Sequence, residues 1–208
     1  MPNVLTTKLS ANDLTLFRGE RCLFRDLSFA LNPGELLLLE GRNGTGKTSL
    51  MRAIAGLISL ETGEIFWGDV PVLSDRQAFH GALVWMAHRV GFKADLTLVE
   101  NLRFEAHLRS QSGADFDEVL HRLDIDRLKR LPIRSLSAGQ QRRVALARML
   151  LSGAPLWLMD EPFTNLDREG RELVMKITGE HLDNDGMCIM AAHQDVEIGS
   201  NVQKIVLQ

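Results

Sequence analysis

The sequence predicts an α/β protein: a parallel sheet core with an antiparallel β layer near the N-terminus and a helical insertion. Segments typical of buried strands alternate with segments of helical spacing, which is the pattern of a parallel sheet. The 208 residues are 45% hydrophobic and 25% charged, an ordinary composition for one globular core. The sequence has no internal repeat or flexible linker. We therefore expect a single domain over residues 1–208.

The N-terminal third predicts the antiparallel layer and the first buried strand. Within residues 1–35, apolar side chains recur at every second position, which is typical of half-buried strands. Residues 35–40 hold four consecutive leucines, the pattern of a strand buried on both faces. From Lys47 to Leu57, leucine and isoleucine recur at helical spacing. The expected order is strand, loop, helix.

The middle of the chain predicts two more strands and then helices. The strands are expected at residues 65–70, after a turn at Glu61-Thr62-Gly63, and at residues 82–87. Thr97 and Glu100 have the spacing of a capping box, which predicts the start of a helix. We therefore expect a mostly helical insertion over residues 89–136, within a helical subdomain that extends to about residue 152.

The C-terminal third predicts a buried helix and two buried strands. Ser137 and Gln140 form a second capping box, which opens a mostly apolar helix. Buried strands then lead to Asp160 and, later, to His193, as the leucine strand leads to Gly41. Because ligands bind at the carboxyl ends of parallel strands, these last three residues should lie at one edge of the sheet.

Charge and cysteine content exclude several functions. The net charge is -3 with both signs interspersed, which gives no basic field for a nucleic acid or an anionic membrane. We interpret Arg142 and Arg143 as a solvated or interface face. Cys22 and Cys188 are far apart, so we expect two small buried residues in a reducing cytosol, without a disulfide or a zinc site. No apolar run reaches the roughly 18 to 20 residues that span a bilayer, so any membrane contact would require partner subunits.

The segment Gly41-Arg42-Asn43-Gly44-Thr45-Gly46-Lys47-Thr48 fits the phosphate-binding pattern G-x-x-x-x-G-K-[ST]. Its glycines let backbone N–H groups turn toward phosphate oxygens, and the following helix adds its positive N-terminal end. We expect all eight residues to bind a nucleotide. Lys47 would reach the β and γ phosphates as a catalytic residue, and Thr48 would offer its hydroxyl to Mg²⁺. Asp160 would be the second magnesium ligand, and Glu161 the general base that polarises the attacking water.

A second motif lies further along the chain. The run Leu136-Ser137-Ala138-Gly139-Gln140, together with the phosphate loop, resembles the ATP-binding cassette (ABC) family of ATPases. The resemblance implies a RecA-like P-loop NTPase core, ATP and Mg²⁺ as cofactors, and a second copy of the chain as partner. In that arrangement Ser137, Gly139 and Gln140 of one copy contact the nucleotide that the other copy holds. An isolated copy would then contact nucleotide on one face only.

The same resemblance gives roles to three other places. Phe17 would stack on the adenine, although a core phenylalanine of the antiparallel layer has the same pattern. His193 would contact the γ phosphate and Glu161. Asn165-Leu166-Asp167 falls where the family has a dimer-contacting loop, and Asp167 can cap a helix at the same time.

A narrower resemblance is to the ATP-binding subunits of cytochrome c maturation haem exporters. It rests on Ala138 in place of the usual second glycine, on residues 160–164 (DEPFT) and on residues 96–104 (LTLVENLRF). It implies integral membrane permease subunits of a haem exporter as partners, with the chain peripheral at the cytoplasmic face of the bacterial inner membrane. His88 stands where most transport ATPases carry a glutamine that touches magnesium. These relatives read His-Gln-Pro-Gly there, so it stays open whether His88 senses the γ phosphate or Arg89 displaces it.

Other functions remain open on the sequence alone. Cargo is handled by subunits outside this sequence, so an exporter of lipoproteins or small molecules fits the same motifs. A soluble, non-transport ATPase of DNA repair would require coiled-coil heptads and a basic surface, and neither is present. A P-loop kinase has no use for residues 137–140. The absence of an N-K-x-D segment favours ATP over GTP.

Overall fold

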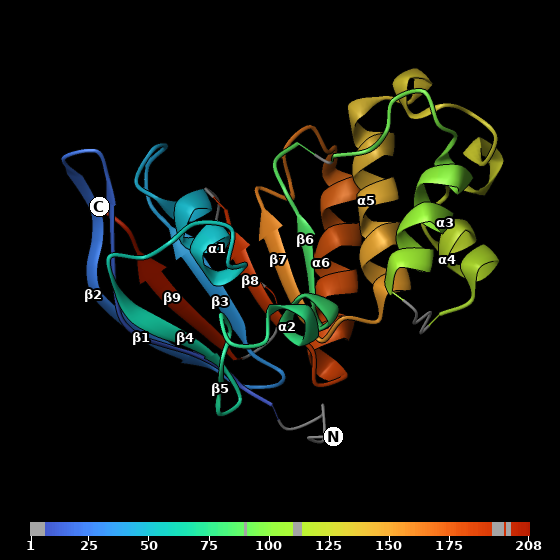
Figure 1. The fold of residues 1–208 in the computed structure, drawn as a ribbon. Coiled ribbons are helices and arrows are strands. Elements are labelled where there is room, and N and C mark those ends of the chain that lie inside the picture. Colours follow the sequence, from blue (N-terminus) through green and yellow to red (C-terminus); the bar gives the residue numbers. More distant parts are fainter. Residues whose placement is uncertain (1–6, 90, 110–113, 193–197, 199–200) are drawn as a thin grey trace.

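The computed structural model describes residues 7–89, 91–109, 114–192, 198 and 201–208. Its strands are β1 (Leu9–Arg18), β2 (Arg21–Leu31), β3 (Leu36–Glu40), β4 (Thr62–Trp67), β5 (Val70–Pro71), β6 (Leu83–Met86), β7 (Leu156–Asp160), β8 (Met187–Ala191) and β9 (Val202–Val206). Its helices are α1 (Lys47–Ile54), α2 (Arg76–Ala82), α3 (Leu98–Arg109), α4 (Phe116–Arg122), α5 (Ala138–Ser152) and α6 (Arg168–Asp183). Figure 1 shows two sheets with α1 near both of them and the helices α3 to α6 on the far side of the larger sheet.

The larger sheet is parallel throughout, with the strand order β6-β7-β8-β3-β9. In β3 successive leucines lie on opposite faces of this sheet. Leu36 and Leu38 pack into a core shared with α3 to α6, whereas Leu37 and Leu39 pack into a second core beneath α1 and the smaller sheet. The expected strand buried on both faces is therefore confirmed. The edge strand β9, which pairs with β3, is an element that the sequence patterns did not predict.

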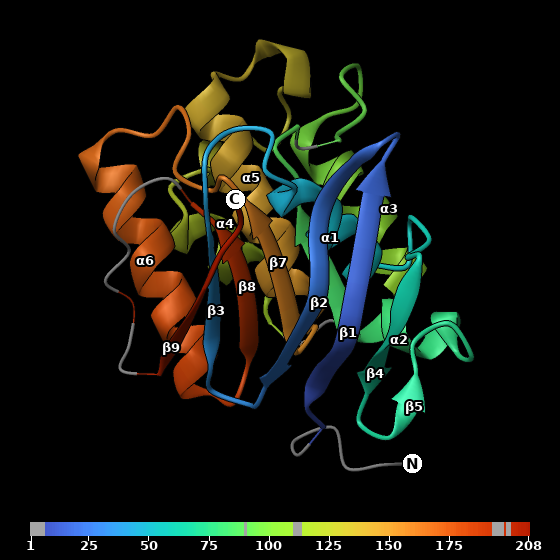
Figure 2. The same ribbon diagram turned by 90° about the vertical axis from the view of Figure 1, so that its left-hand side faces the viewer.

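The smaller sheet is antiparallel, with the order β2-β1-β4-β5, and Figure 2 shows β1 and β2 running across the front of the molecule. The expected strand at residues 65–70 is displaced. β4 begins at Thr62 and ends at Trp67, because Gly68 adopts a φ of 63° and turns the chain into β5. The prediction that both cysteines are buried is half wrong: Cys188 is buried, but Cys22 is only half-buried.

The helix α1 ends earlier than its apolar spacing predicts. Gly56 adopts a φ of 67° after the helix, and its N–H donates to the carbonyl of Ala53 at 2.9 Å. The N–H of Leu57 donates to the carbonyl of Arg52 at 2.8 Å, which completes a Schellman motif. Leu57 therefore lies outside the helix with 58% of its surface exposed, and the predicted helix through residue 57 is wrong at its end.

Both predicted capping boxes are present. Thr97 and Glu100 exchange hydrogen bonds before α3, and α5 begins at a capping box and ends at Gly153, which has a φ of 60°. In the described residues, no helix is both long enough and apolar enough to cross a membrane. The single-domain interpretation stays a prediction.

Candidate functional site

The glycine-rich loop connects β3 to α1 and has a backbone that only glycine tolerates at its start. Gly41 has a φ of 138°, and a Cβ there would lie 2.4 Å from the carbonyl oxygen of Leu207. Gly44 and Gly46 also have positive φ values, 83° and 112°. Such a run of residues turns successive N–H groups toward one side, which suits an anion. The side chain of Thr45 closes the loop by donating to the carbonyl of Arg42 at 3.0 Å.

Lys47, the first residue of α1, points back into this loop. Its Nζ donates to the carbonyl oxygens of Gly41 at 2.6 Å and of Arg42 at 3.1 Å. The side chain is 6% exposed. Burial lowers the pKa of Lys47, whereas the negative charges of Glu161 and Asp160 oppose that effect. The ammonium is therefore held inside the loop over residues 41–48, the phosphate cradle, which a triphosphate would enter.

Thr48 and Asp160 meet across the gap between α1 and the end of β7. The Thr48 hydroxyl donates to Oδ2 of Asp160 at 2.8 Å, and Asp160 is 3% exposed. Magnesium prefers oxygen ligands and is commonly held by one or two of them together with phosphate and water oxygens. Among the described residues, no cluster of three His, Cys, Asp or Glu side chains could hold a metal alone. The Thr48 hydroxyl and the Asp160 carboxylate are oxygen donors of the kind that magnesium binds.

Glu161 follows β7 in a left-handed conformation with a φ of 51°, which costs about 1–2 kcal/mol for a residue with a side chain. Its N–H donates to the carbonyl of Ala191 at 2.9 Å, and the hydroxyl of Thr164 donates to its Oε2 at 3.3 Å. Backbone strain of this kind persists where surrounding contacts enforce it. The negative charges of Glu161 and Asp160 both act on Lys47.

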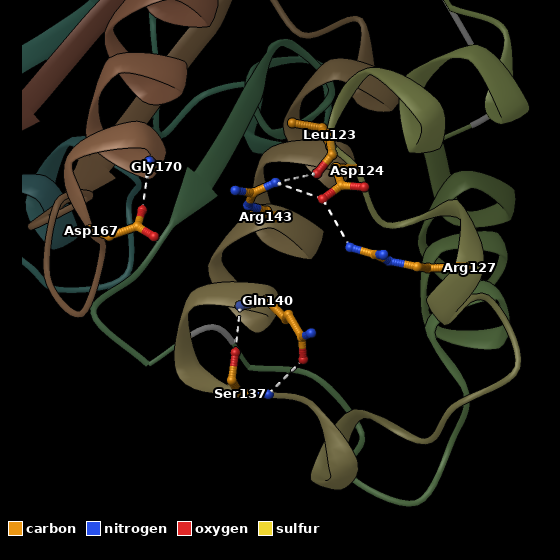
Figure 3. A network of polar contacts seen from close by, with 8 residues as sticks. All are labelled: Leu123, Asp124, Arg127, Ser137, Gln140, Arg143, Asp167 and Gly170. Carbon is orange, nitrogen blue, oxygen red and sulfur yellow. Dashed lines mark hydrogen bonds and ion pairs between the residues drawn. The ribbon is translucent and has the colours of Figure 1, made fainter.

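The N-terminus of α5 forms a separate, exposed tip. Ser137 and Gln140 cap each other: the Ser137 N–H donates to Gln140 Oε1 at 2.9 Å, and the Gln140 N–H donates to Ser137 Oγ at 3.2 Å, as Figure 3 shows. A Cβ on Gly139 would lie 3.6 Å from the carbonyl of Asn165, so this tip packs beside the loop before α6. Within the described residues, no hydrogen bond joins the tip to the phosphate loop of the same chain.

The remaining predicted site residues have different outcomes. Phe17 is half-buried on β1, with the guanidinium of Arg25 5.9 Å from its ring centroid, and its adenine contact stays a prediction. His88 is exposed and lines a cavity of about 360 Å³ with Asn165. Asp167 caps α6 by accepting from the Gly170 N–H at 2.8 Å, as Figure 3 also shows. His193 lies outside the described residues.

Sequence patterns misjudged one residue. Arg142 was expected on a solvated or interface face, but it is only 4% exposed and donates to the carbonyl of Ala87 at 3.3 Å. Ala145 and Met149, three and seven positions further along α5, are fully buried. That helical spacing, which places Arg142 on the inner face, was the signal that could have found it.

Comparisons with known proteins agree with this arrangement. The family model described as "ABC transporter" matches residues 24–164. A protein of Vibrio cholerae serotype O1, named cytochrome c biogenesis ATP-binding export protein CcmA, is 44% identical over 90% of this chain and 92% of its own length. A protein of Methylococcus capsulatus with the same name is 41% identical over 96% of this chain and 97% of its own length.

Solved structures share the fold at lower identity. One titled "Structure of ATP binding subunit of ABC transporter" has a TM-score of 0.82 and 23% identity, covering 89% of this chain and 79% of that chain. A putative ABC transporter ATP-binding protein from Pyrococcus furiosus has a TM-score of 0.80 and 22% identity, covering 95% of this chain and 96% of that chain.

Proposed function

Because the chain belongs to the ABC transporter family of ATP-binding proteins, we propose that it binds and hydrolyses ATP with magnesium between two copies of itself. The observation that carries this proposal is the convergence of Lys47, Thr48, Asp160 and Glu161 at the carboxyl ends of β3 and β7. Backbone N–H groups of the loop over residues 41–48 would hold the phosphate oxygens.

The roles of the four side chains follow from their positions. Lys47 would leave the loop carbonyls and bind the β and γ phosphates, because a phosphate oxygen is a better partner for an ammonium than a neutral carbonyl. Thr48 and Asp160 would hold magnesium, which supplies positive charge to the phosphates in the transition state. Glu161, next to that site, would accept the proton of the attacking water.

The exposed tip of α5 supports the proposal that a second copy of the chain takes part in binding ATP. Among the described residues no hydrogen bond joins the tip to the phosphate loop of its own chain, and a helix N-terminus favours an anion. The tip would therefore contact the γ phosphate held by the partner copy, so each triphosphate lies between the cradle of one protomer and the Ser137 tip of the other. ATP binding would close the pair, and hydrolysis would release it.

We further propose that this cycle drives export in cytochrome c biogenesis. The support is the printed name of the relatives, matched at 41–44% identity over nearly the whole chain. The chain would act at the cytoplasmic face of the inner membrane, bound to integral permease subunits that carry haem or a haem-carrier complex. Co-purification from membranes should recover those subunits. A deletion strain should lose cytochrome c and regain it with the wild-type gene but not with Glu161→Gln.

The hydrolysis mechanism has its own test. Glu161→Gln keeps the side-chain shape but removes the base, so the ATPase rate should fall at least about a hundredfold while ATP binding is kept. Size-exclusion chromatography with ATP should then show a stable dimer. A variant that turns over at the wild-type rate would exclude Glu161 as the base.

The proposed contact between the Ser137 tip of one copy and the γ phosphate held by the other is tested by Ser137→Asp. Aspartate caps a helix as well as serine does, so the melting temperature should be kept, whereas its charge would repel the partner's γ phosphate. We expect the variant, combined with Glu161→Gln, to bind ATP and remain monomeric. An ATP-dependent dimer of normal stability would refute the proposed sandwich.

A further inference from the structure

Arg148 is an arginine of α5 whose side chain is only 11% exposed and contacts three other segments. Its Nη1 donates to Oε1 of Glu105 on α3 at 3.2 Å, and its Nη2 donates to the carbonyl oxygen of Trp85 on β6 at 2.9 Å. Its guanidinium carbon lies 5.0 Å from the centroid of the Phe92 ring. One side chain therefore joins two helices, a strand of the larger sheet and the segment that follows this strand.

A guanidinium suits this position because its donors point in fixed, coplanar directions and can bind two elements at once. The carboxylate of Glu105, 28% exposed, balances the charge, which makes the burial of Arg148 tolerable. The face of an aromatic ring at this distance is a further partner for the cation. Removing Arg148 would therefore leave a largely buried carboxylate without its ion pair and would separate α3 from the end of β6.

A second arginine attaches α5 to the same strand end. Arg142 donates to the carbonyl oxygen of Ala87, two residues beyond Trp85, at 3.3 Å. Two attachment points along a rigid helix fix its angle, whereas one attachment point leaves it free to pivot. The ion pair of Arg148 adds α3 to the attachment, and Figure 1 shows α5 between the larger sheet and the helices α3 and α4.

The angle of α5 decides where its tip lies. With Arg142 as a single pivot, the Ser137 cap lies about 8 Å away along the helix axis, at about 1.5 Å of rise per residue. A tilt of about 10° would then move the tip by about 1.3 Å. Hydrogen bonds between N–H groups and oxygen atoms tolerate a range of only about 0.5 Å in length, so such a displacement would disrupt contacts made by the tip.

We propose that Arg148 is a positioning residue that, together with Glu105, fixes the angle of α5 on the larger sheet and so holds the Ser137 tip where it meets the nucleotide of the partner copy. The inference rests on the proposed ATP sandwich. The contacts of Arg148 with Glu105, Trp85 and Phe92 lie outside the phosphate cradle. Its loss should therefore spare nucleotide binding by the cradle of the same chain and weaken the closure of the pair.

The test compares these two properties in the Glu161→Gln background, in which ATP should hold the dimer. Analytical ultracentrifugation with ATP and Mg²⁺ gives the dissociation constant of the dimer. Titration of a fluorescent ATP analogue into dilute, monomeric protein gives the affinity of the cradle. Adding Arg148→Gln should raise the dimer dissociation constant at least about tenfold, because a misplacement of about 1 Å is costly, and should leave the affinity of the cradle unchanged. An unchanged dimer dissociation constant would overturn the inference.

A merely structural role gives a different result. It would lower the melting temperature of Arg148→Gln without changing the dimer dissociation constant of the folded chain, so both constants are measured where circular dichroism shows every variant to be folded. Arg148→Lys should recover only part of the dimer affinity, because one ammonium cannot bind Glu105 and the carbonyl of Trp85 with the same fixed geometry. Full recovery would mean that charge alone matters, and the positioning role would be refuted.

Arg143→Gln is the matched control. It removes a guanidinium from the same helix, but one that binds the carbonyl of Leu123 at 3.1 Å and Asp124 at 3.6 Å, as Figure 3 shows, and does not attach α5 to β6 through these contacts. Its dimer dissociation constant should stay at the value of the Glu161→Gln parent. An equal rise in this control would overturn the inference, because the effect would then be a general loss of positive charge from α5.

Glu105→Gln tests the same link from α3 and covers the case in which Arg148→Gln does not fold. Glutamine keeps an oxygen acceptor but removes the charge, so the dimer dissociation constant should rise at least about threefold. The double variant should be no weaker than Arg148→Gln alone, because both residues act through one ion pair. An unchanged constant in Glu105→Gln would refute the link. A Glu161→Gln parent that forms no dimer with ATP would instead refute the proposed sandwich, and the inference with it.

Discussion

Acid should destabilise the chain through His181, a half-buried histidine in the last turn of α6. Its ring stacks on Trp157 with centroids 3.8 Å apart and an interplanar angle of 8°, and its Nε2 lies 3.3 Å from the carbonyl oxygen of Met187. Burial lowers the pKa of His181 from 6.5 to about 4, although its backbone hydrogen bonds act in the opposite direction. A helix C-terminus would also favour the cation, so desolvation is the dominant effect here.

The direction of the pH effect follows from the two pKa values. Above about pH 6.5 the ring is neutral in both states and contributes no pH dependence. Between 6.5 and about 4 the unfolded chain binds a proton that the folded chain does not, so the free energy of unfolding falls as the pH falls. The gap between the two pKa values corresponds to about 3 kcal/mol, most of it lost by about pH 4.5.

Urea unfolding followed by tryptophan fluorescence, from about pH 7.5 to about pH 4.5, measures this loss. His181→Gln removes the titrating group. It should be less stable than the wild type at about pH 7.5, because the stacking is lost, but should lose about 2.5 kcal/mol less on acidification to about pH 4.5. Carboxylates titrate in both proteins and cancel in the difference. Equal losses in the two proteins would refute the assignment to His181.

Two further predictions concern the phosphate cradle. Gly41→Ala should abolish nucleotide binding and lower stability by more than about 3 kcal/mol, because its Cβ would lie 2.4 Å from a backbone oxygen. Gly19→Ala, with a φ of 62° and open space around it, should lose only about 1 kcal/mol, and equal losses in the two melting curves would contradict the steric argument. Thr48→Val should bind free nucleotide in EDTA as the wild type does, but adding Mg²⁺ should no longer raise its nucleotide affinity. Thr48→Ser should keep both properties. If Mg²⁺ still raised the nucleotide affinity of the valine variant, the hydroxyl would be excluded as a ligand.

Sequence patterns predicted the parts of this molecule that depend on local chemistry. Four leucines without alternation indicate burial on two faces, and β3 divides them between two cores. The capping boxes at Thr97 and Ser137 are formed by residues three positions apart, so they fold as the pattern predicts. The phosphate loop also folds as its local pattern predicts, since its glycines adopt the positive φ values that the motif requires.

The parts that were missed depend on contacts between distant segments. β9 is a short edge strand with exposed positions, and its pairing with β3 joins residues far apart in sequence. Arg142 appeared to be a surface residue because arginine is rarely buried. The apolar spacing of α5 places it on the inner face, but its hydrogen-bond acceptor, the carbonyl of Ala87, belongs to a segment distant in sequence.

The tip of α5 is a different case, because the structure of one copy leaves its purpose unexplained. Ser137 and Gln140 satisfy each other, yet the amides of Ala138 and Gly139 have no acceptor among the described residues. Exposed amides at a helix start can be hydrated, so they do not require a ligand for stability. The glycine at the second helical position, Gly139, is not explained by stability, because glycine in a helix costs about 1 kcal/mol relative to alanine. In the proposed sandwich, the amides of this tip would meet the γ phosphate that another copy holds.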